Sequence, residues 1–471
     1  MPEYLYFILS GVLSVGVLVG IFLMSKVKTS VLGNRISAVC TLGAIIVTLI
    51  ANEILPVWAL YIALAVGIAI GIIFALRVKM IQMPQMVALL NGLGGAASAI
   101  VGGLAIFGFS LTMGKPATIN AFAIVTAGIA LFIGCVTLIG SLIAAGKLHK
   151  VITQRPIIFK GHQIYTIISL ILTVASVILL PIFYNELIAV IILTSCIAVF
   201  SSLFGFFFSI RVGGADMPIT ISLLNSLSGV AGAIAGLAVA DPLLVAIGGI
   251  VGASGLLLTQ IMCRSMNRHL MDILLGKTSS AGKHVAVQEE VKEEVEDDTI
   301  EEKVDVKELL TKAKKVIIVP GYGMAIAQAQ HLVKQLADKL ISCGVQVKYA
   351  VHPVAGRMPG HMNVLLCEAN VDYEDLYEMD AINGEFADAD ATIVIGANDV
   401  LNPAANTAEG TPIYGMPVLN VINCKHIFIF NYDLKPGYAG VPNPIYTRKH
   451  GVELLLGNAS VTLKDFIDKL N

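Results

Sequence analysis

Two glycines that follow a short apolar run have the spacing of a nucleotide-binding turn. Residues 316–320 (VIIVP) have the composition of a buried strand, and Gly321 and Gly323 come directly after it, before a stretch with helical periodicity. Glycines at this point of a strand–turn–helix unit leave room for a pyrophosphate against the N-terminus of the helix. A lone GxG is a weak signal, but its place between a strand and a helix favours a dinucleotide site.

The loop after the next predicted strand carries a cation where an ordinary NAD site has an acid. The strand 345–353 ends in His352 and Pro353, and Arg357 follows within VAGRMPGHMN (354–363). An acid at this point would hold the ribose 2′-hydroxyl of NAD, whereas an arginine binds phosphate in a bidentate manner. The loop therefore favours NADP, whose ribose is phosphorylated, or an unusual placement of the pyrophosphate.

Two more segments of the C-terminal half are candidates for ligand contact. The strand 391–396 runs into GANDVLNPAA (396–405), which is rich in short side chains that can bond a ligand. The segment GYAGV (437–441) has the composition of a flexible loop that can close over one. In α/β proteins, function is expected at the carboxyl ends of the strands.

The N-terminal half has few polar side chains inside apolar sequence, and such groups are usually functional. Asp216 stands where the segment 217–240 begins, and Asn225 lies nine residues further, about 13 Å along a helix. Asn91 occupies a matching place in another apolar segment. Two structural interpretations stay open: Asp216 is a helix N-cap, and the two asparagines form hydrogen bonds between helices.

Long apolar segments fill the first part of the chain. A bilayer core requires roughly 20 apolar residues per helix. Nine segments meet this requirement: 4–24, 34–53, 56–76, 85–109, 119–146, 163–184, 187–210, 217–240 and 242–265. Residues 1–276 are therefore predicted to form a polytopic α-helical membrane domain.

The charges of the connecting loops predict the orientation of these helices. Thirteen basic residues lie in the odd-numbered loops, counted from the first helix, and in the stretch after the ninth helix: Lys26, Lys28, Arg35, Arg77, Lys79, Lys147, Lys150, Arg155, Lys160, Arg211, Arg264, Arg268 and Lys277. The even-numbered loops, on the other side of the membrane, carry only Lys115. Positively charged loops stay in the cytoplasm. We therefore expect these loops and the C-terminal domain in the cytoplasm and the N-terminus outside.

A repeat lies within the membrane half. The segments MPQMVALLNGLGGAASAIVG (83–102) and MPITISLLNSLSGVAGAIAG (217–236) share 11 of 20 positions without gaps, at a spacing of 134 residues. Each copy begins with Met-Pro, carries one asparagine and then becomes rich in glycine and alanine. Small residues let helix backbones approach closely, so both segments are predicted to be tightly packed central helices.

The composition changes after the membrane half. Residues 277–313 are acidic and without aromatic residues, as is typical of a solvated linker. From 314 to 471 the pattern alternates between strands at 316–320, 345–353, 391–396, 417–421 and 426–431 and helical stretches such as 324–343. Such alternation predicts an α/β doubly wound, Rossmann-like domain with a parallel sheet.

Charge and cysteine usage exclude some classes of function. The net charge of −2 gives no reason to expect a nucleic acid as partner, and the seven cysteines stand singly. The absence of a CxxC or Cys/His cluster argues against a structural zinc site. No metal ligand set is expected.

These motifs together resemble the beta subunits of proton-translocating NAD(P) transhydrogenases. The resemblance covers nearly the whole chain. The segments that carry it are PGYGMAIAQAQ, HPVAGRMPGHMNVLL, IGANDVLNPAA, GMPVL, GYAGV and the membrane motif GGADMP followed by LNS.

The resemblance implies a function that neither half performs alone. Hydride would pass between NADH and NADP⁺, with NADP(H) bound here and NAD(H) on a partner alpha subunit, while a proton crosses the bacterial cytoplasmic membrane inward. It implies a dimer of alpha–beta units and a proton-linked region at Asp216, Asn225 and Asn91. The expected nucleotide-binding residues are Gly321, Tyr322, Gly323, Val354, Ala355, Gly356, Arg357, Met358, Pro359, Gly396, Ala397, Asn398, Asp399, Val400, Gly415, Met416, Lys435, Gly437 and Tyr438.

Two positions depart from the family pattern. Many members have a histidine where this chain has Asn91, and an asparagine cannot carry a proton. Members usually have Lys-Arg-Ser after the strand 426–431 to hold the 2′-phosphate, where this chain has residues 431–433 (NYD). Lys435, Lys425 and Arg357 are the cations that could compensate.

Two other functions remain open. A transporter or channel regulated by a dinucleotide-binding domain would normally show the acid after strand two that this chain lacks. A membrane anchor for a soluble dehydrogenase would need neither Asp216 nor the repeat.

Overall fold

The computed structural model forms two compact units, Met1–Gln260 and Ile261–Asn471. It describes residues 2–470 apart from 25–26, 79–81, 109–119, 155, 215, 266–269, 276–305, 357–359, 410, 412, 438 and 449. Arg357, Met358, Pro359 and Tyr438, all expected at the nucleotide site, lie outside the described residues. So does the expected linker as far as residue 305; a short helix, α11 (Val306–Lys312), follows.

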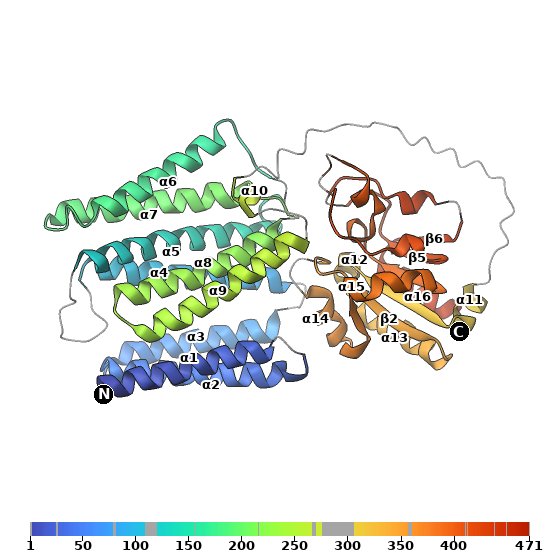
Figure 1. Cartoon of the computed structure of the whole chain (residues 1–471), viewed down its shortest axis with the longest axis horizontal. Helices are drawn as coiled ribbons and strands as arrows, with labels where there is room; N and C mark the ends of the chain where they lie inside the picture. Colours follow the sequence, from blue (N-terminus) through green and yellow to red (C-terminus); the bar gives the residue numbers. More distant parts are fainter. Residues whose placement is uncertain are drawn as a thin grey trace. The chain divides into compact units, whose positions relative to one another are not determined.

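The first unit consists of long apolar helices, labelled in Figure 1. The nine predicted membrane helices are confirmed among the described residues. They are α1 (Glu3–Met24), α2 (Val27–Ala51), α3 (Trp58–Arg77), α4 (Met83–Ile106), α5 (Ala121–Leu148), α6 (His162–Leu179), α7 (Leu187–Ile210), α8 (Met217–Ala238) and α9 (Pro242–Ser265). Their length and composition make this part a multi-pass membrane protein.

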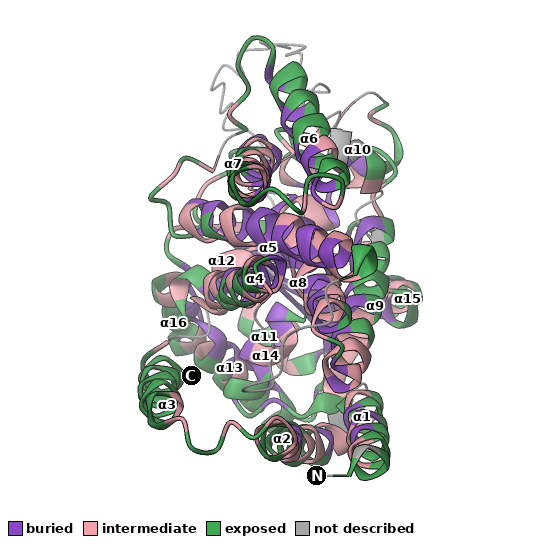
Figure 2. Ribbon diagram, turned by 90° about the vertical axis from the view of Figure 1, so that its left-hand side faces the viewer, coloured by how far each residue is buried: buried purple, intermediate pink, exposed green. Residues whose placement is uncertain are grey.

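The two repeated segments are central helices, as predicted. In Figure 2, α5 and α8 are largely buried, whereas α3 is exposed along its length. A Cβ on Gly95 of α4 would lie 2.8 Å from the Gly134 carbonyl oxygen of α5. A Cβ on Gly229 of α8 would lie 2.9 Å from the Gly252 Cα of α9. Because Gly95 and Gly229 occupy equivalent positions of the repeat, both copies pack on the next helix by the same close backbone approach.

The second unit contains a parallel sheet. Its strands are β1 (Lys315–Pro320), β2 (Gln346–Val351), β3 (Leu376–Glu378), β4 (Ala391–Ile395), β5 (His426–Asn431) and β6 (Val452–Leu456). Their spatial order is β3-β2-β1-β4-β5-β6, and every neighbouring pair is parallel. This is the order of the doubly wound dinucleotide-binding fold, so the predicted fold class is confirmed.

Helices flank the sheet and complete its core. They are α12 (Tyr322–Ala327), α13 (Gln330–Ser342), α14 (His361–Glu368), α15 (Met379–Ile382) and α16 (Ala459–Lys469). The central strands β1 and β4 are apolar and almost wholly buried, as a parallel sheet covered on both faces requires. Ile317, Val394 and Phe386 belong to one buried cluster, which holds the central strand ends in place.

One strand predicted from the sequence is absent from the structure, and two strands of the structure were not predicted. Residues 417–421 form no strand, because side chains bind this backbone: Asn383 donates to the Val418 carbonyl oxygen at 3.0 Å and accepts from the Asn420 N–H. The missed strands, β3 and β6, lie at the two edges of the sheet. The predicted helix 324–343 is divided into α12 and α13 at Gln328, whose φ is 51°.

Candidate functional site

The strand order reverses between β1 and β4, and their carboxyl ends define the candidate site. In doubly wound sheets, ligands bind in the crevice at this point. Gly321 follows β1, and Gly396 follows β4. The Gly321 N–H donates to the Ile395 carbonyl oxygen at 2.8 Å, and the Gly323 N–H donates to the Gly396 carbonyl oxygen at 2.8 Å. The two loops are therefore joined backbone to backbone.

Three glycines make this contact possible. A Cβ on Gly321 would lie 2.5 Å from the Ala397 Cα, and a Cβ on Gly323 would lie 2.6 Å from the Gly396 Cα. Gly396 also has φ +67° and would meet Gly323 and Met324 if it carried a Cβ. Sequence reasoning assigned the space beside Gly321 and Gly323 to a pyrophosphate. In this structure the loop after β4 is packed there, so the glycines first serve the approach of the two loops.

His352 fixes the loop after β2. It is buried, and its Nε2 lies 2.8 Å from the Pro417 carbonyl oxygen. The Val354 N–H donates to Nδ1 at 3.2 Å, so Nε2 carries the proton and donates to Pro417. Burial lowers the pKa of His352 to about 4, although the bond to Pro417 opposes the shift. The ring is therefore neutral at physiological pH and positions Val354 and Ala355 rather than transferring a proton.

The short polar side chains after β4 hold the loop that contains residues 437–441. Asn398 Nδ2 donates to the Lys435 carbonyl oxygen at 3.1 Å, and the Ala439 N–H donates to Asp399 Oδ2 at 3.0 Å. Gly437 lies against the Asp399 carboxylate, where a Cβ would be 2.6 Å from Cγ. Residues 437–441, predicted to close over a ligand, are called the predicted lid below. Asn398 and Asp399, expected to contact a ligand, thus also bind this segment and the residues before it.

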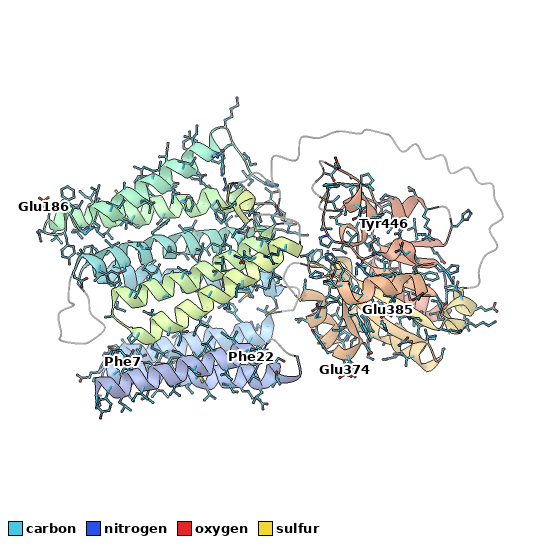
Figure 3. The ribbon with its side chains drawn as sticks, viewed as in Figure 1. Phe7, Phe22, Glu186, Glu374, Glu385 and Tyr446 are labelled. Atoms are coloured by element: carbon cyan, nitrogen blue, oxygen red, sulfur yellow. The ribbon has the colours of Figure 1, made fainter. Side chains whose placement is uncertain are left out.

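A second layer of polar contacts supports this loop, and the sequence did not predict it. Asn402 Nδ2 donates to the Pro442 carbonyl oxygen at 3.2 Å, and Asn443 Nδ2 donates to Asn398 Oδ1 at 3.1 Å. Asn431 Nδ2 donates to the Tyr446 hydroxyl at 2.7 Å; Figure 3 labels Tyr446. Burial raises the pKa of Tyr446 to about 12, so the hydroxyl stays protonated. Asn398 and Asn443 are 45 residues apart in the sequence, so no local signal predicted their contact.

Gly415 and Met416 approach the same loop from another side. The Gly415 N–H donates to the Ala405 carbonyl oxygen at 2.7 Å, and Gly415 has φ +75°. Met416 packs in a small apolar cluster with Ala439 and Val441. The structure therefore brings together the segments that follow β4, the segment before η7 (Val421–Asn423) and the predicted lid.

The cations expected to replace Lys-Arg differ in position. Lys435 follows β5, but it is exposed and its Nζ lies 3.6 Å from Asp433 Oδ2. An exposed pair of this kind contributes about 0–1 kcal/mol and can rearrange. Lys425 precedes β5, so it lies about 20 Å along the strand from the carboxyl end and is excluded as a phosphate ligand by its position.

The three candidate proton-linked residues, Asn91, Asp216 and Asn225, lie on the two repeated helices or directly before one of them. Asn91 of α4 is buried, and its Nδ2 donates to the Ile221 carbonyl oxygen of α8 at 3.3 Å. Asn225 of α8 is half-buried. Asp216 is buried at the start of α8, but its backbone has φ −88° and ψ −1°, and its side chain makes no capping hydrogen bond to the described part of α8. Asp216 therefore occupies the N-cap position of α8 without the side-chain bond that makes a cap, whereas the interhelical bond of Asn91 is present.

Comparison with known proteins gives the family. The model of the family described as NAD(P) transhydrogenase beta subunit matches residues 6–469. Two relatives named NAD(P) transhydrogenase subunit beta, both from Rhodospirillum rubrum and one from a named strain, are 39% identical over 469 residues, which cover 99% of this chain and 98% of theirs. Both comparisons span the membrane helices and the Rossmann-like domain. The chain therefore belongs to the family of NAD(P) transhydrogenase beta subunits.

Proposed function

We propose that this chain binds NADP(H) and, with an alpha subunit that binds NAD(H), transfers hydride between NADH and NADP⁺ while a proton crosses the membrane inward. Membership of the family supports nicotinamide nucleotide use, an alpha-subunit partner and embedding in a membrane. The observation that supports a nucleotide site on this chain is the close approach of the glycine-containing loops after β1 and β4. We further propose a dimer of alpha–beta units in the bacterial cytoplasmic membrane, with the C-terminal domain in the cytoplasm.

The residues present fit a dinucleotide at the ends of β1 and β4. Gly321, Gly323 and Gly396 let the loops after β1 and β4 pack backbone to backbone where the strand order reverses. Asn398 and Asp399 tether a loop beside it. A bound nicotinamide nucleotide supplies the hydride donor or acceptor, so no side chain has to act as acid or base. The chain's own contribution is to fix one ring and exclude water, which favours a near-attack geometry.

The proton can drive hydride transfer only by supplying free energy to it. One proton that crosses about 100 mV releases about 2.3 kcal/mol, which shifts the nucleotide equilibrium roughly 50-fold at about 1.4 kcal/mol per decade. The two processes stay independent unless the protonation state of the membrane helices changes the affinity of the nucleotide domain for its nucleotide. Asp216, Asn225 and Asn91 are the residues to which we assign the proton-linked change.

The experiment that tests this function uses vesicles that contain both subunits. With NADH and NADP⁺ supplied and a gradient of about 100 mV imposed, we expect the final product of the NADPH/NADP⁺ and NAD⁺/NADH ratios to exceed that with an uncoupler roughly 50-fold. Equal ratios would contradict coupling and favour a membrane-anchored dehydrogenase. Ion flux without the second nucleotide would instead favour a regulated channel.

Preference for NADP(H) is the second expectation, and it concerns the nucleotide domain by itself. The segment from Val306 onward includes α11, whose Leu310 is fully buried, so this segment should fold alone. We expect it to bind NADP⁺ more tightly than NAD⁺, with Arg357 contacting the 2′-phosphate. Titration calorimetry with both nucleotides measures the difference.

The opposite order would give Asp433 a defined role. If NAD⁺ binds equally well or better, the assignment of NADP is wrong, and Asp433 holds a free ribose hydroxyl. In that case Asp433→Asn should weaken NAD⁺ and leave NADP⁺ unchanged.

A further inference from the structure

A buried lysine ties the end of α5 to the connection between α7 and α8. Lys147 has no exposed surface, and its Nζ donates to the Ile210 carbonyl oxygen and, at 2.8 Å, to the Val212 carbonyl oxygen. Ile210 is the last residue of α7. Carbonyls at a helix C-terminus lack intrahelical donors and carry partial negative charge. The ammonium group of Lys147 therefore fits this position.

The chain after α5 binds the same connection. The Gly214 N–H donates to the Gln154 carbonyl oxygen at 2.9 Å, and the Ile157 N–H donates to the Ile210 carbonyl oxygen at 3.2 Å. A Cβ on Gly213 would lie 3.2 Å from Pro156. The connection at 210–214 is thus held from one side by both a side chain and the backbone of the segment after α5.

This connection leads directly to Asp216. Met217, the first residue of α8, is fully buried in a cluster with Ala144 and Leu148 of α5. The end of α5, the connection at 210–214 and the start of α8 are therefore packed as one body. The Asp216 N–H donates to the Gly213 carbonyl oxygen at 3.2 Å, so Asp216 is bonded to the connection that Lys147 holds.

Full burial of an ammonium group has a cost that a purely structural contact would avoid. Desolvation of a charge costs several kcal/mol, and a well-packed apolar side chain at such a place is often as stable or more so. A buried ammonium group that donates to backbone carbonyl oxygens fixes the position of one element relative to another through bonds of defined direction. The sequence indicated Lys147 only as a loop charge, because a lysine next to the end of a helix is usually exposed. Nothing in the local sequence signals that it is buried.

We propose that Lys147 is a positioning residue, which holds the start of α8 and thereby links the state of Asp216 to α5. The proposal rests on the proposed function. The observation that carries it is that one side chain donates to two carbonyl oxygens, of Ile210 at the end of α7 and of Val212 just after it, a few residues before Asp216. Lys147 does not itself transfer the proton.

The test compares three variants in vesicles that contain both subunits. Lys147→Met keeps the apolar stem and loses the donors, Lys147→Arg keeps charge and donors, and Lys147→Gln keeps donors on a shorter stem. The measurements are hydride transfer with an uncoupler present and protons moved per hydride transferred. We expect Lys147→Met to lower the number of protons moved per hydride at least about five-fold while hydride transfer with an uncoupler is retained. Lys147→Arg should keep the wild-type ratio.

Each outcome has a defined meaning. The positioning role is overturned if Lys147→Met moves as many protons per hydride as the wild type. It is also overturned if Lys147→Arg lowers this number as much as Lys147→Met does. Either result leaves the proposed function intact. If Lys147→Met does not reach the membrane, Lys147→Gln decides: a reduced ratio supports the role, and an unchanged ratio overturns it. If the wild-type vesicles transfer hydride without moving protons, the proposed function fails and this inference fails with it.

Discussion

Replacement of Asp216 by asparagine is expected to abolish proton translocation by vesicles that contain this chain and its alpha subunit. Asp216 is a buried acid at the start of α8, and an asparagine of nearly the same shape cannot bind or release a proton. Uncoupled hydride transfer should persist, because that step needs only the two nucleotides at the right distance. Proton uptake, followed with a pH-sensitive dye, measures the loss.

Asp241 provides a matched control for this variant. It also stands at the start of a membrane helix, α9, but its Oδ1 accepts from the Leu243 N–H at 2.9 Å, the Leu244 N–H at 3.2 Å and the Tyr6 hydroxyl at 2.7 Å. These bonds define an N-cap, and asparagine caps a helix about as well as aspartate. Asp241→Asn should therefore retain proton translocation.

The pair of variants separates two roles that the sequence left open. If Asp216→Asn moves protons normally, then Asp216 is a structural residue despite its lack of a capping bond, and the proton path depends on other groups. If both variants lose proton translocation, a carboxylate is required at the start of both helices. The loss in Asp216→Asn would then assign no particular proton-linked role to Asp216. Loss in Asp216→Asn alone supports the proposed proton-linked role.

The membrane helices were predictable because the bilayer acts on length and composition. A helix that crosses it needs a long apolar run whatever its neighbours are, so α1 to α9 could be placed before any packing was known. The repeat was also predictable, since glycines such as Gly95 and Gly229 recur at one spacing. The burial of Lys147 was not, because it depends on where the connection after α7 lies.

The nucleotide domain was predictable at its centre and not at its edges. The central strands β1 and β4 are continuous apolar runs, as strands buried on both faces are. The edge strand β3 has only three residues, and β6 contains Glu453, so neither has a clear pattern. Residues 417–421 misled because they are apolar and partly β-branched, while their backbone is bound by Asn383 rather than by another strand.

The candidate site shows the same limit. Its glycines could be found from their place after a strand, but the partner they pack against could not. Likewise, Asn398 and Asp399 were recognised as polar loop residues that can bond a ligand. Their contacts with Lys435 and Ala439 depend on a loop about 40 residues away along the chain. Such contacts follow from the fold and carry little local sequence signal.

Gly396→Ala is expected to destabilise the nucleotide domain by about 2–4 kcal/mol. A residue with a side chain at positive φ is strained, by about 1 kcal/mol, and forced overpacking costs about 1–3 kcal/mol more. At Gly396 both apply, because its φ is +67° and its Cβ would meet the backbone of Gly323 and Met324. Since the two loops would have to separate, NADP(H) affinity should fall as well. Urea unfolding of the segment from Val306 onward and calorimetry measure the two effects.

Two other glycines of the domain separate the causes. Gly344 has φ +88° and Gly384 has an ordinary φ, and a Cβ on either would meet nothing within 4 Å. Gly344→Ala should therefore show the strain alone, about 1 kcal/mol, and Gly384→Ala should stay within about 0.5 kcal/mol of the wild type. Neither should change nucleotide affinity. If Gly396→Ala loses no more stability than Gly344→Ala and binds NADP⁺ normally, then the backbone contact between the loops after β1 and β4 does not shape the site, and the observation on which the proposed function rests is lost.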